Sequence, residues 1–154
     1  MKIRWKILAL SFVIVFGVAF LGSLFTTPVT NSEWYESIKP AITPPNYVFP
    51  IVWNILFLLI TISIYLSWTS AKKKQKTKLA WAFGINLFLN ALWSLIFFTM
   101  KNPPLAFFEL ILLDISIFFL IYTTNKIDKT SSYLLIPYFL WVTFAGYLNY
   151  LMAF

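Results

Sequence analysis

The sequence predicts an all-α membrane protein, a bundle of five transmembrane helices that forms one domain over residues 1–154. Of its 154 residues, 60% are hydrophobic and only 11% are charged, whereas soluble domains carry about 25% charged residues. The apolar residues gather in blocks of roughly 20, long enough for a helix to cross a hydrocarbon core of about 30 Å. Because lipid offers backbone groups no partners, runs of this length favour helices over barrel strands. The five blocks are 7–25, 47–69, 79–100, 104–124 and 133–154.

The first block follows the basic start "MKIRWK", so a cleaved signal peptide is an alternative interpretation. Its apolar run is longer than the usual core of such a peptide, and no small-x-small cleavage pattern precedes the next segment. We therefore expect residues 7–25 to remain as the first helix.

The second block is entered through "ITPPNYVFPIVW". Thr43 is expected to cap the helix, with Pro44 at its first position and Pro50 straining or kinking the first turns. Trp53 then lies about 9 Å below the helix start, deeper than an interfacial tryptophan. Two aromatic residues are expected to anchor the helix end at the interface: Tyr47 and Phe49.

The third block carries a polar stripe, because Asn86, Asn90 and Ser94 recur every four residues. Trp93 lies beside that stripe at about the depth of Trp53. Lipid has no use for asparagine, so the stripe is expected to face the bundle interior. It serves either as hydrogen-bonded contact between helices or as part of a binding site.

The fourth and fifth blocks also carry polar positions inside the membrane. Asp114, with Glu109 on the same helix, lies level with Asn90 and is expected to be protonated or hydrogen-bonded. It is either a structural partner or a proton carrier. The fifth block repeats the four-residue spacing with one stripe: Trp141, Ala145 and Asn149.

Basic residues are distributed unequally between the two sides. Ten Lys and Arg residues lie in the N-terminus, the 70–78 loop and the 125–132 loop, against only Lys39 and Lys101 opposite. This asymmetry predicts a cytoplasmic N-terminus and an outer C-terminus. The net charge of +7 is therefore a topology signal rather than a sign of nucleic-acid binding. "AKKKQKTK" is either a solvated loop or a contact for anionic lipid.

The longest connection, residues 26–46, faces outward and is a candidate lid. Three tryptophans on three helices converge beneath it, with a few polar groups and one small residue nearby. Aromatic walls of this kind favour a flat, mostly apolar ligand. The three tryptophans are Trp53, Trp93 and Trp141.

The chain contains no Cys and no His, which excludes disulfides, thiol catalysis and the usual haem and zinc ligands. We therefore expect no metal and no resident cofactor. The apolar blocks contain no lysine in their interiors, which excludes a retinal Schiff base.

Four separated motifs resemble the TspO/MBR family of tryptophan-rich sensory and translocator proteins. "WYESIKPAITPP" is similar to the loop pattern WY-x-x-L-x-KP-x-W-x-PP, and "PPNYVFPIVW" continues it. "LNALWSLIFF" and "LLIPYFLWVTFAGYLN" resemble the third-helix and fifth-helix motifs. The loop is one residue shorter than the pattern, and Ile42 stands where the family has Trp. The proposed cholesterol motif is absent after Tyr147 and Tyr150.

The resemblance implies a five-helix, multi-pass integral membrane protein of a prokaryotic cell, often a homodimer. It implies binding of porphyrins or other flat heterocycles beneath the first loop, with a sensory, regulatory or transport role. It also implies eight pocket residues: Tyr35, Trp53, Phe57, Asn90, Trp93, Ser94, Trp141 and Ala145.

Two further functions stay open at this stage. One is light-dependent porphyrin degradation, for which the resemblance implicates Trp53 and Trp141 as redox residues. No acid–base pair or metal site supports a conventional enzyme. The other is proton-coupled transport through Asp114 and Glu109, although the two halves of the chain show no repeat.

Overall fold

The computed structural model describes residues 3–154, and those residues form helices and no strands. Five segments are long and apolar enough to span a membrane, which confirms the predicted fold class. Their bounds are α1 Trp5–Thr26, α3 Val48–Ser70, α4 Lys73–Ser94 continued by the π-helix η1 Leu95–Thr99, α5 Pro103–Asn125, and α6 Lys129–Tyr133 leading into α7 Ile136–Ala153. Lys2, counted in the charge asymmetry, lies outside the described residues.

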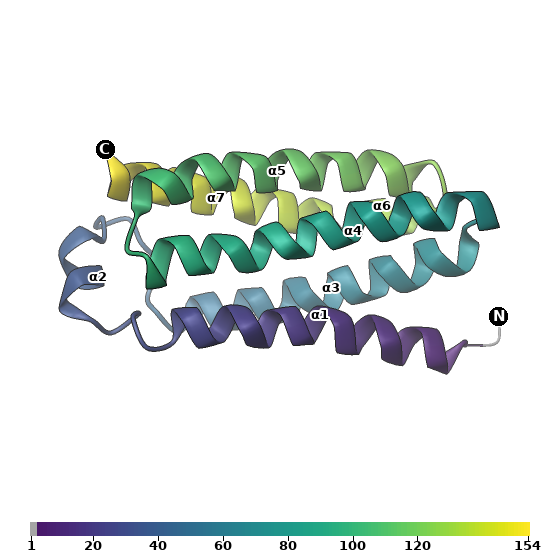
Figure 1. Ribbon diagram of the computed structural model, residues 1–154, viewed down its shortest axis with the longest axis horizontal. Helices are drawn as coiled ribbons and strands as arrows, with labels where there is room; N and C mark the ends of the chain where they lie inside the picture. The colour runs from purple at the N-terminus through teal and green to yellow at the C-terminus, as the bar shows by residue number, and fades with distance from the viewer. Residues whose placement is uncertain (1–2) are drawn as a thin grey trace.

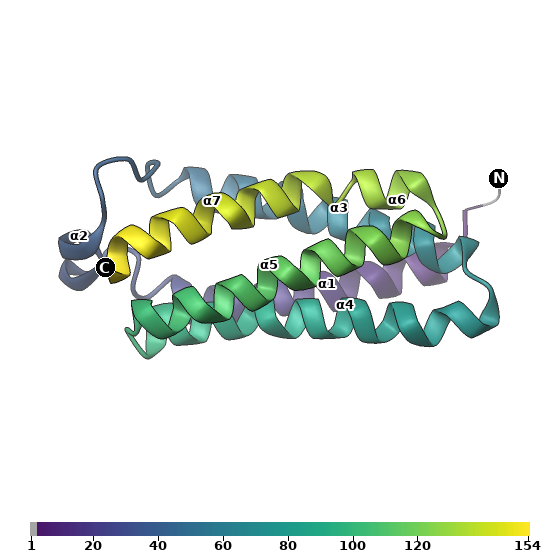
Figure 2. The ribbon, with the colours of Figure 1, turned by 90° about the horizontal axis from the view of Figure 1, so that it is seen from above.

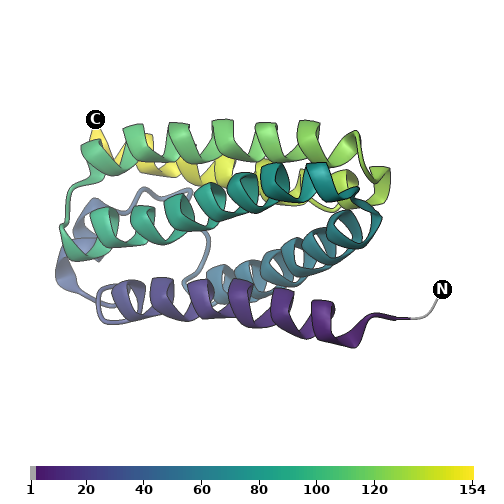
Figure 3. The same cartoon turned by 45° about the vertical axis from the view of Figure 1, so that its right-hand side comes forward.

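The long helices form a ring in which α3 packs on α1, α1 on α4, α4 on α5 and α5 on α7. The ring closes only sparsely between α7 and α3. Figure 1 shows the short helix α2 (Glu33–Ile38) across one end of the bundle, beside the C-terminus, with the N-terminus at the other end. Figures 2 and 3 show α1 beside α3 and α4 beside α5 from two further directions.

The lysine-rich end differs from the prediction, because α4 begins at Lys73 and the expected 70–78 loop is mostly helix. Gln75 caps the start of this helix: its Oε1 accepts from Lys72 N at 2.8 Å, and its own N donates to Lys72 O at 2.8 Å. Lysine and glutamine are good helix formers, and long lysine side chains reach the aqueous interface from a helical backbone. A run of lysines therefore does not by itself indicate a loop.

The start of α3 also differs. The helix begins at Val48, so Thr43 does not cap it and Pro44 is not its first residue. Both lie in turns before the helix, where Thr43 N donates to Pro40 O and Val48 N donates to Pro45 O, each at 2.9 Å. Pro50 is the third residue of α3, a position whose N–H has no helical acceptor in any case.

The ring is fastened at the lysine-rich end by polar contacts between α3 and α6. The hydroxyl of Ser63 donates to Ser131 O at 2.9 Å, and that of Ser131 donates to Ser63 O at 2.8 Å. Both serines are fully buried. The α3–α6 contact thus holds the ring together at the end opposite α2.

Candidate functional site

Aromatic rings, rather than close backbone contact, fill the space between α3 and α7. Phe49 of α3 lies edge-on to Trp141 of α7, with 5.8 Å between ring centroids. One turn deeper, Trp53 lies edge-on to Tyr138 at 6.2 Å and stacks on Phe57 at 5.4 Å. We call these five residues the α3–α7 ladder. Phe49 is half-buried in the ladder at the outer end of α3. Tyr47, just before that helix, is 68% exposed.

Two buried polar atoms near the outer end of the bundle have no hydrogen-bond partner among the described residues. They are Nε1 of Trp141 in the ladder and Oγ1 of Thr43 in the connection before α3. A buried polar group without a partner costs about 1–3 kcal/mol. The indole N–H of Trp141 is therefore a buried donor that no described residue uses.

The polar stripe of α4 is engaged in contacts between helices. Asn90 Nδ2 donates to the Tyr138 hydroxyl at 3.1 Å, and that hydroxyl donates to Asn86 Oδ1 at 3.3 Å. Asn86 Nδ2 in turn donates to Ser116 Oγ of α5 at 2.8 Å. The stripe faces the interior as predicted, and it joins α4 to both α5 and α7. Tyr138, which the sequence analysis did not single out, is its centre.

Trp93 contacts α7 at Asn149, two turns along the helix from Trp141 of the ladder. Its Nε1 donates to Asn149 Oδ1 at 3.0 Å, while Asn149 Nδ2 donates to Pro103 O at 2.8 Å. The Trp93 ring stacks on Phe97 at 5.2 Å. The indole donor of Trp93 is therefore already used, whereas that of Trp141 is free.

Trp93 belongs to a second aromatic cluster, which lies under α2. Tyr35 packs against Phe97 and Phe98, with ring centroids at 6.4 and 5.9 Å. Three consecutive residues of η1, 96–98, are buried, because the π-turn is wider than an α-turn and brings Phe97 and Phe98 inward together. We call this the lid cluster: Trp34, Tyr35, Trp93, Phe97 and Phe98. Burial raises the pKa of the Tyr35 hydroxyl, and the neighbouring Glu36 adds to the effect.

The remaining predicted residues lie elsewhere on the interior surface. Ser94 is buried where α1 crosses α4, with its hydroxyl oxygen 3.6 Å from where a Cβ on Gly22 would stand. Ala145 is half-buried against the main core beside the ladder. The structure thus joins Trp53 and Phe57 directly, Asn90 to Trp53 through Tyr138, and Trp141 to α3 through Phe49. It places Tyr35 and Trp93 in the lid cluster and Ser94 at a helix crossing.

The two carboxyl groups of α5 have different surroundings. The sequence predicted that Asp114 is either protonated or hydrogen-bonded. It is hydrogen-bonded, because it accepts from the Thr143 hydroxyl at 3.0 Å. The pair lies in a groove on the outer surface between α5 and α7, lined also by Phe107 and Tyr147. Glu109 is buried, and neither of its carboxyl oxygens has a partner within residues 3–154. That outer groove contains none of the eight predicted pocket residues.

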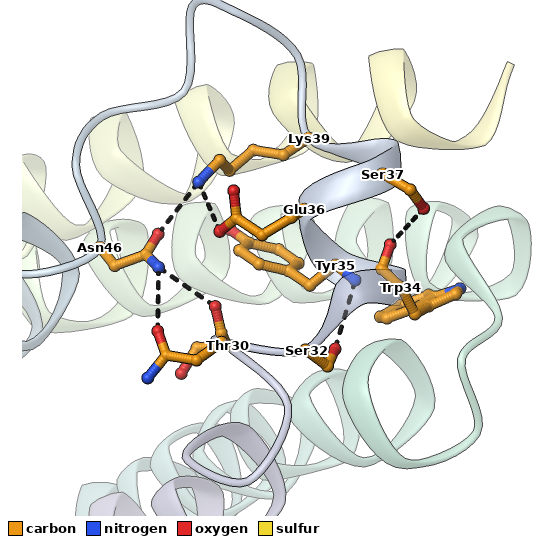
Figure 4. A network of polar contacts seen from close by, with 9 residues as sticks. Thr30, Ser32, Trp34, Tyr35, Glu36, Ser37, Lys39 and Asn46 are labelled. Carbon is orange, nitrogen blue, oxygen red and sulfur yellow. Dashed lines mark hydrogen bonds and ion pairs between the residues drawn. The ribbon is translucent and has the colours of Figure 1, made fainter.

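A polar network stabilises the connection of residues 26–46, which contains α2 and which we call the lid (Figure 4). Lys39 Nζ lies 2.8 Å from Glu36 Oε1 and 3.5 Å from Asn46 Oδ1, and it stands 5.7 Å above the centre of the Tyr35 ring. Asn46 Nδ2 donates to Thr30 O at 3.1 Å, which ties the chain after α2 to the chain before it. At the other edge, Lys101 Nζ lies 5.7 Å from the Trp34 ring centre.

The network makes lid stability depend on pH. The hydrogen bond from Lys39, together with its charge, lowers the pKa of Glu36 below its usual 4.5. The stabilisation is therefore present above about pH 4.5 and is lost as pH falls through the lowered value. We expect Glu36→Gln to lower the melting temperature at pH 7, with the difference from wild type shrinking as the pH is lowered below 4.5. Glu33→Gln, on the same helix but outside the network, is the control; an equal shift for both would refute the prediction.

The comparisons with known proteins agree with this architecture. The family model of the TspO/MBR family matches residues 10–154. A tryptophan-rich protein TspO of Chlorobaculum tepidum is 36% identical over 93% of this chain and 91% of its own length. Another of the same name from Archaeoglobus fulgidus is 36% identical over 93% of this chain and 92% of its own. The translocator protein of Bos taurus is 27% identical over 86% of this chain and 80% of its own.

These matches and the five spans make the protein an integral, multi-pass membrane protein, and its bacterial relatives fit a prokaryotic origin. The likeness extends over nearly the whole chain rather than one motif, and it includes relatives named as sensory and as translocator proteins. The chain belongs to the TspO/MBR family.

Proposed function

We propose that this protein binds a flat, mostly apolar heterocycle of the protoporphyrin type between α3 and α7, beneath the lid formed by α2. The relatives' names place it among membrane sensory and translocator proteins, and a bound pigment gives such a protein something to sense or move. The observation that carries the proposal is the free, buried indole N–H of Trp141 within the α3–α7 ladder.

The packing around Trp141 supports this location. Helices α3 and α7 touch sparsely, so side chains rather than backbones set their spacing. A flat ring system that enters between α3 and α7 exchanges the Phe49–Trp141 and Trp53–Tyr138 ring contacts for equivalent ones. Each such contact is worth about 0.5–1.5 kcal/mol beyond area burial. An acceptor on its edge would satisfy Trp141 Nε1. The ring of Phe49, at the outer end of the ladder, would have to turn aside first.

The chemistry of the chain favours a metal-free ring. The sequence has no His and no Cys, the usual axial ligands of haem iron. We therefore expect protoporphyrin to bind more tightly than haem. The preference rests on the residues of the chain and does not require a particular pose.

The test is a titration of the purified protein with protoporphyrin, followed by the shift of the porphyrin absorbance band. The double variant Trp53→Phe/Trp141→Phe keeps aromatic rings but removes the free donor and shrinks two stacking surfaces. We expect it to weaken binding by about tenfold or more. The matched control is Trp81→Phe, because Trp81 is 69% exposed on α4 and lies outside the ladder.

Three outcomes would contradict the proposal. Wild-type protein could show no saturable shift at micromolar porphyrin. The double variant and Trp81→Phe could bind equally well. Haem could bind as tightly as protoporphyrin, which would remove the argument from the missing iron ligands. Melting temperatures of all variants show whether a loss of binding reflects the site or the fold.

A further inference from the structure

Glu109 of α5 carries a carboxyl group inside the bundle that the fold leaves unpaired. The residue is 6% exposed, and neither Oε1 nor Oε2 has a hydrogen-bond partner among residues 3–154. It lies six residues into the span Pro103–Asn125, about 9 Å from the lid end of the helix. Asp114 on the same helix is different, because it accepts from Thr143 at the outer groove. Structural hydrogen bonding therefore accounts for Asp114 but not for Glu109.

The polar donors at the level of Glu109 are already used. Helices α4 and α5 run antiparallel, and Asn86 of α4 donates to Ser116 of α5. Seven residues, or about 10 Å, toward the lid on each helix, Trp93 and Glu109 lie level with each other. Trp93 Nε1 donates to Asn149, and the Asn149 amide donates to a backbone carbonyl of α5. Neither side chain has a donor left for the carboxyl group.

The elements packed against α5 offer Glu109 no positive charge. The segments α7, η1 and α4 from residue 79 onward contain no Asp, Glu, Lys or Arg. Helix α6 carries Lys129, but it packs at the lysine-rich end, away from the lid. Besides these two residues, the titratable side chains of α5, α6 and α7 are Asp114, Tyr122, Tyr133, Tyr138, Tyr147 and Tyr150. Each of these is neutral or negative, so none stabilises a carboxylate.

The surroundings of Glu109 along α5 are apolar on both sides. Ala106, one turn toward the lid, is fully buried and packs with Tyr35 and Phe97 of the lid cluster. Leu110 and its neighbours along the helix belong to the main core. A buried carboxylate without a partner is far more costly than the neutral acid, so such a group takes up a proton. A negative charge at this position would need water between the main core and the lid cluster.

From these observations we infer that Glu109 is a proton-binding site of the bundle. The closed bundle holds it as the neutral acid; when the proton passes to entering water, the hydrated carboxylate loosens the packing beneath the lid. The site is separate from the proposed heterocycle site.

The site makes lid closure depend on pH in the direction opposite to that of Glu36. The closed form holds one proton more than the open form at Glu109, so closure weakens as pH rises. The Glu36 network instead weakens as pH falls. The lid is therefore closed most firmly between the two pH ranges.

Infrared spectroscopy of the full chain in detergent, without porphyrin, tests the proton site directly. The chain has only five carboxyl side chains, so the C=O stretching band of a neutral acid can be assigned. We expect wild type to show this band at pH 7, Glu109→Gln to lose a component of it, and the matched variant Asp114→Asn to keep that component. No acid band in wild type, or no change in Glu109→Gln, would overturn the inference. A component that appeared only after removal of Na⁺ and K⁺ would assign the site to a metal cation instead.

Limited proteolysis within residues 26–46 tests the link to the lid. Glutamine has the shape of the neutral acid but cannot lose a proton, so Glu109→Gln should melt near wild type at pH 6. Rates are compared at the same pH, which cancels the pH dependence of the protease. The ratio of wild-type to Glu109→Gln cleavage should grow about tenfold or more from pH 6 to pH 9, because an opening that releases one proton gains up to about tenfold per pH unit.

The control variant Asp114→Asn should follow wild type at both pH values. A constant ratio of wild type to Glu109→Gln would overturn the link between Glu109 and the lid. Loss of the pH response in Asp114→Asn alone would assign the proton to Asp114. Because these measurements need no porphyrin, their failure would leave the proposed heterocycle site unaffected.

Discussion

Replacing Phe97 with alanine is expected to lower the free energy of unfolding by about 3–5 kcal/mol, the usual cost of removing a buried phenylalanine ring. Phe97 is 2% exposed and is the centre of the lid cluster, with its ring in contact with those of Trp34, Trp93 and Phe98. The alanine leaves a cavity between α2 and η1 that these rings cannot close without moving. Packing of this kind holds helices together where lipid weakens the hydrophobic drive.

Equilibrium unfolding in detergent measures this effect. The control is Phe119→Ala, because Phe119 is 60% exposed on α5 and its loss leaves no interior cavity. A second readout follows the lid: protease cleavage within residues 26–46 should accelerate in Phe97→Ala and stay unchanged in Phe119→Ala. Equal stability of the two variants would show that the lid cluster contributes no specific packing.

Most of the fold could be predicted because the bilayer constrains it so strongly. The first, second and fourth apolar blocks agree with α1, α3 and α5 to within two residues, since the thickness of the hydrocarbon core sets the length of a span. The interior stripe of Asn86 and Asn90 was predictable for a related reason: an amide has no partner in lipid and must face another helix.

The misses occurred where tertiary contacts override local signals. The lysines at 73–78 indicated a loop, yet their long side chains reach water from a helix. The π-turn of η1 has no simple sequence signal, and it decides that Phe97 and Phe98 face inward together. Because this turn could not be predicted, the packing of Tyr35 against Phe97 and Phe98 in the lid cluster could not be predicted either.

The same limit applies to individual hydrogen bonds in the candidate site. The sequence placed Trp53, Trp93 and Trp141 on three helices beneath the same outer loop. It could not show that Asn149 satisfies the indole donor of Trp93 while that of Trp141 is left free. That difference separates a structural tryptophan from the one proposed to meet the ligand, and it depends on side-chain geometry across α4 and α7.

The structural role of Trp93 leads to the second large effect, which we expect from Asn149→Leu. Asn149 is 1% exposed and joins Trp93 of α4 to Pro103 of α5 through its two amide atoms. Leucine fills a similar volume but leaves the Trp93 N–H buried without an acceptor, a cost of about 1–3 kcal/mol in unfolding free energy. Asn54→Leu is the control, because Asn54 is exposed on α3 and bonds only to Pro50 O of its own helix.

A double-mutant cycle separates the unpaired donor from simple misfit. Trp93→Phe removes the indole N–H, so Asn149→Leu made in that background has no Trp93 donor to strand. We expect its cost there to be smaller by about 1 kcal/mol or more than in wild type, a coupling typical of residues in direct contact. If the two substitutions were additive, the amide of Asn149 would act through packing alone. In that case the hydrogen bond from Trp93 to Asn149 would not contribute to stability.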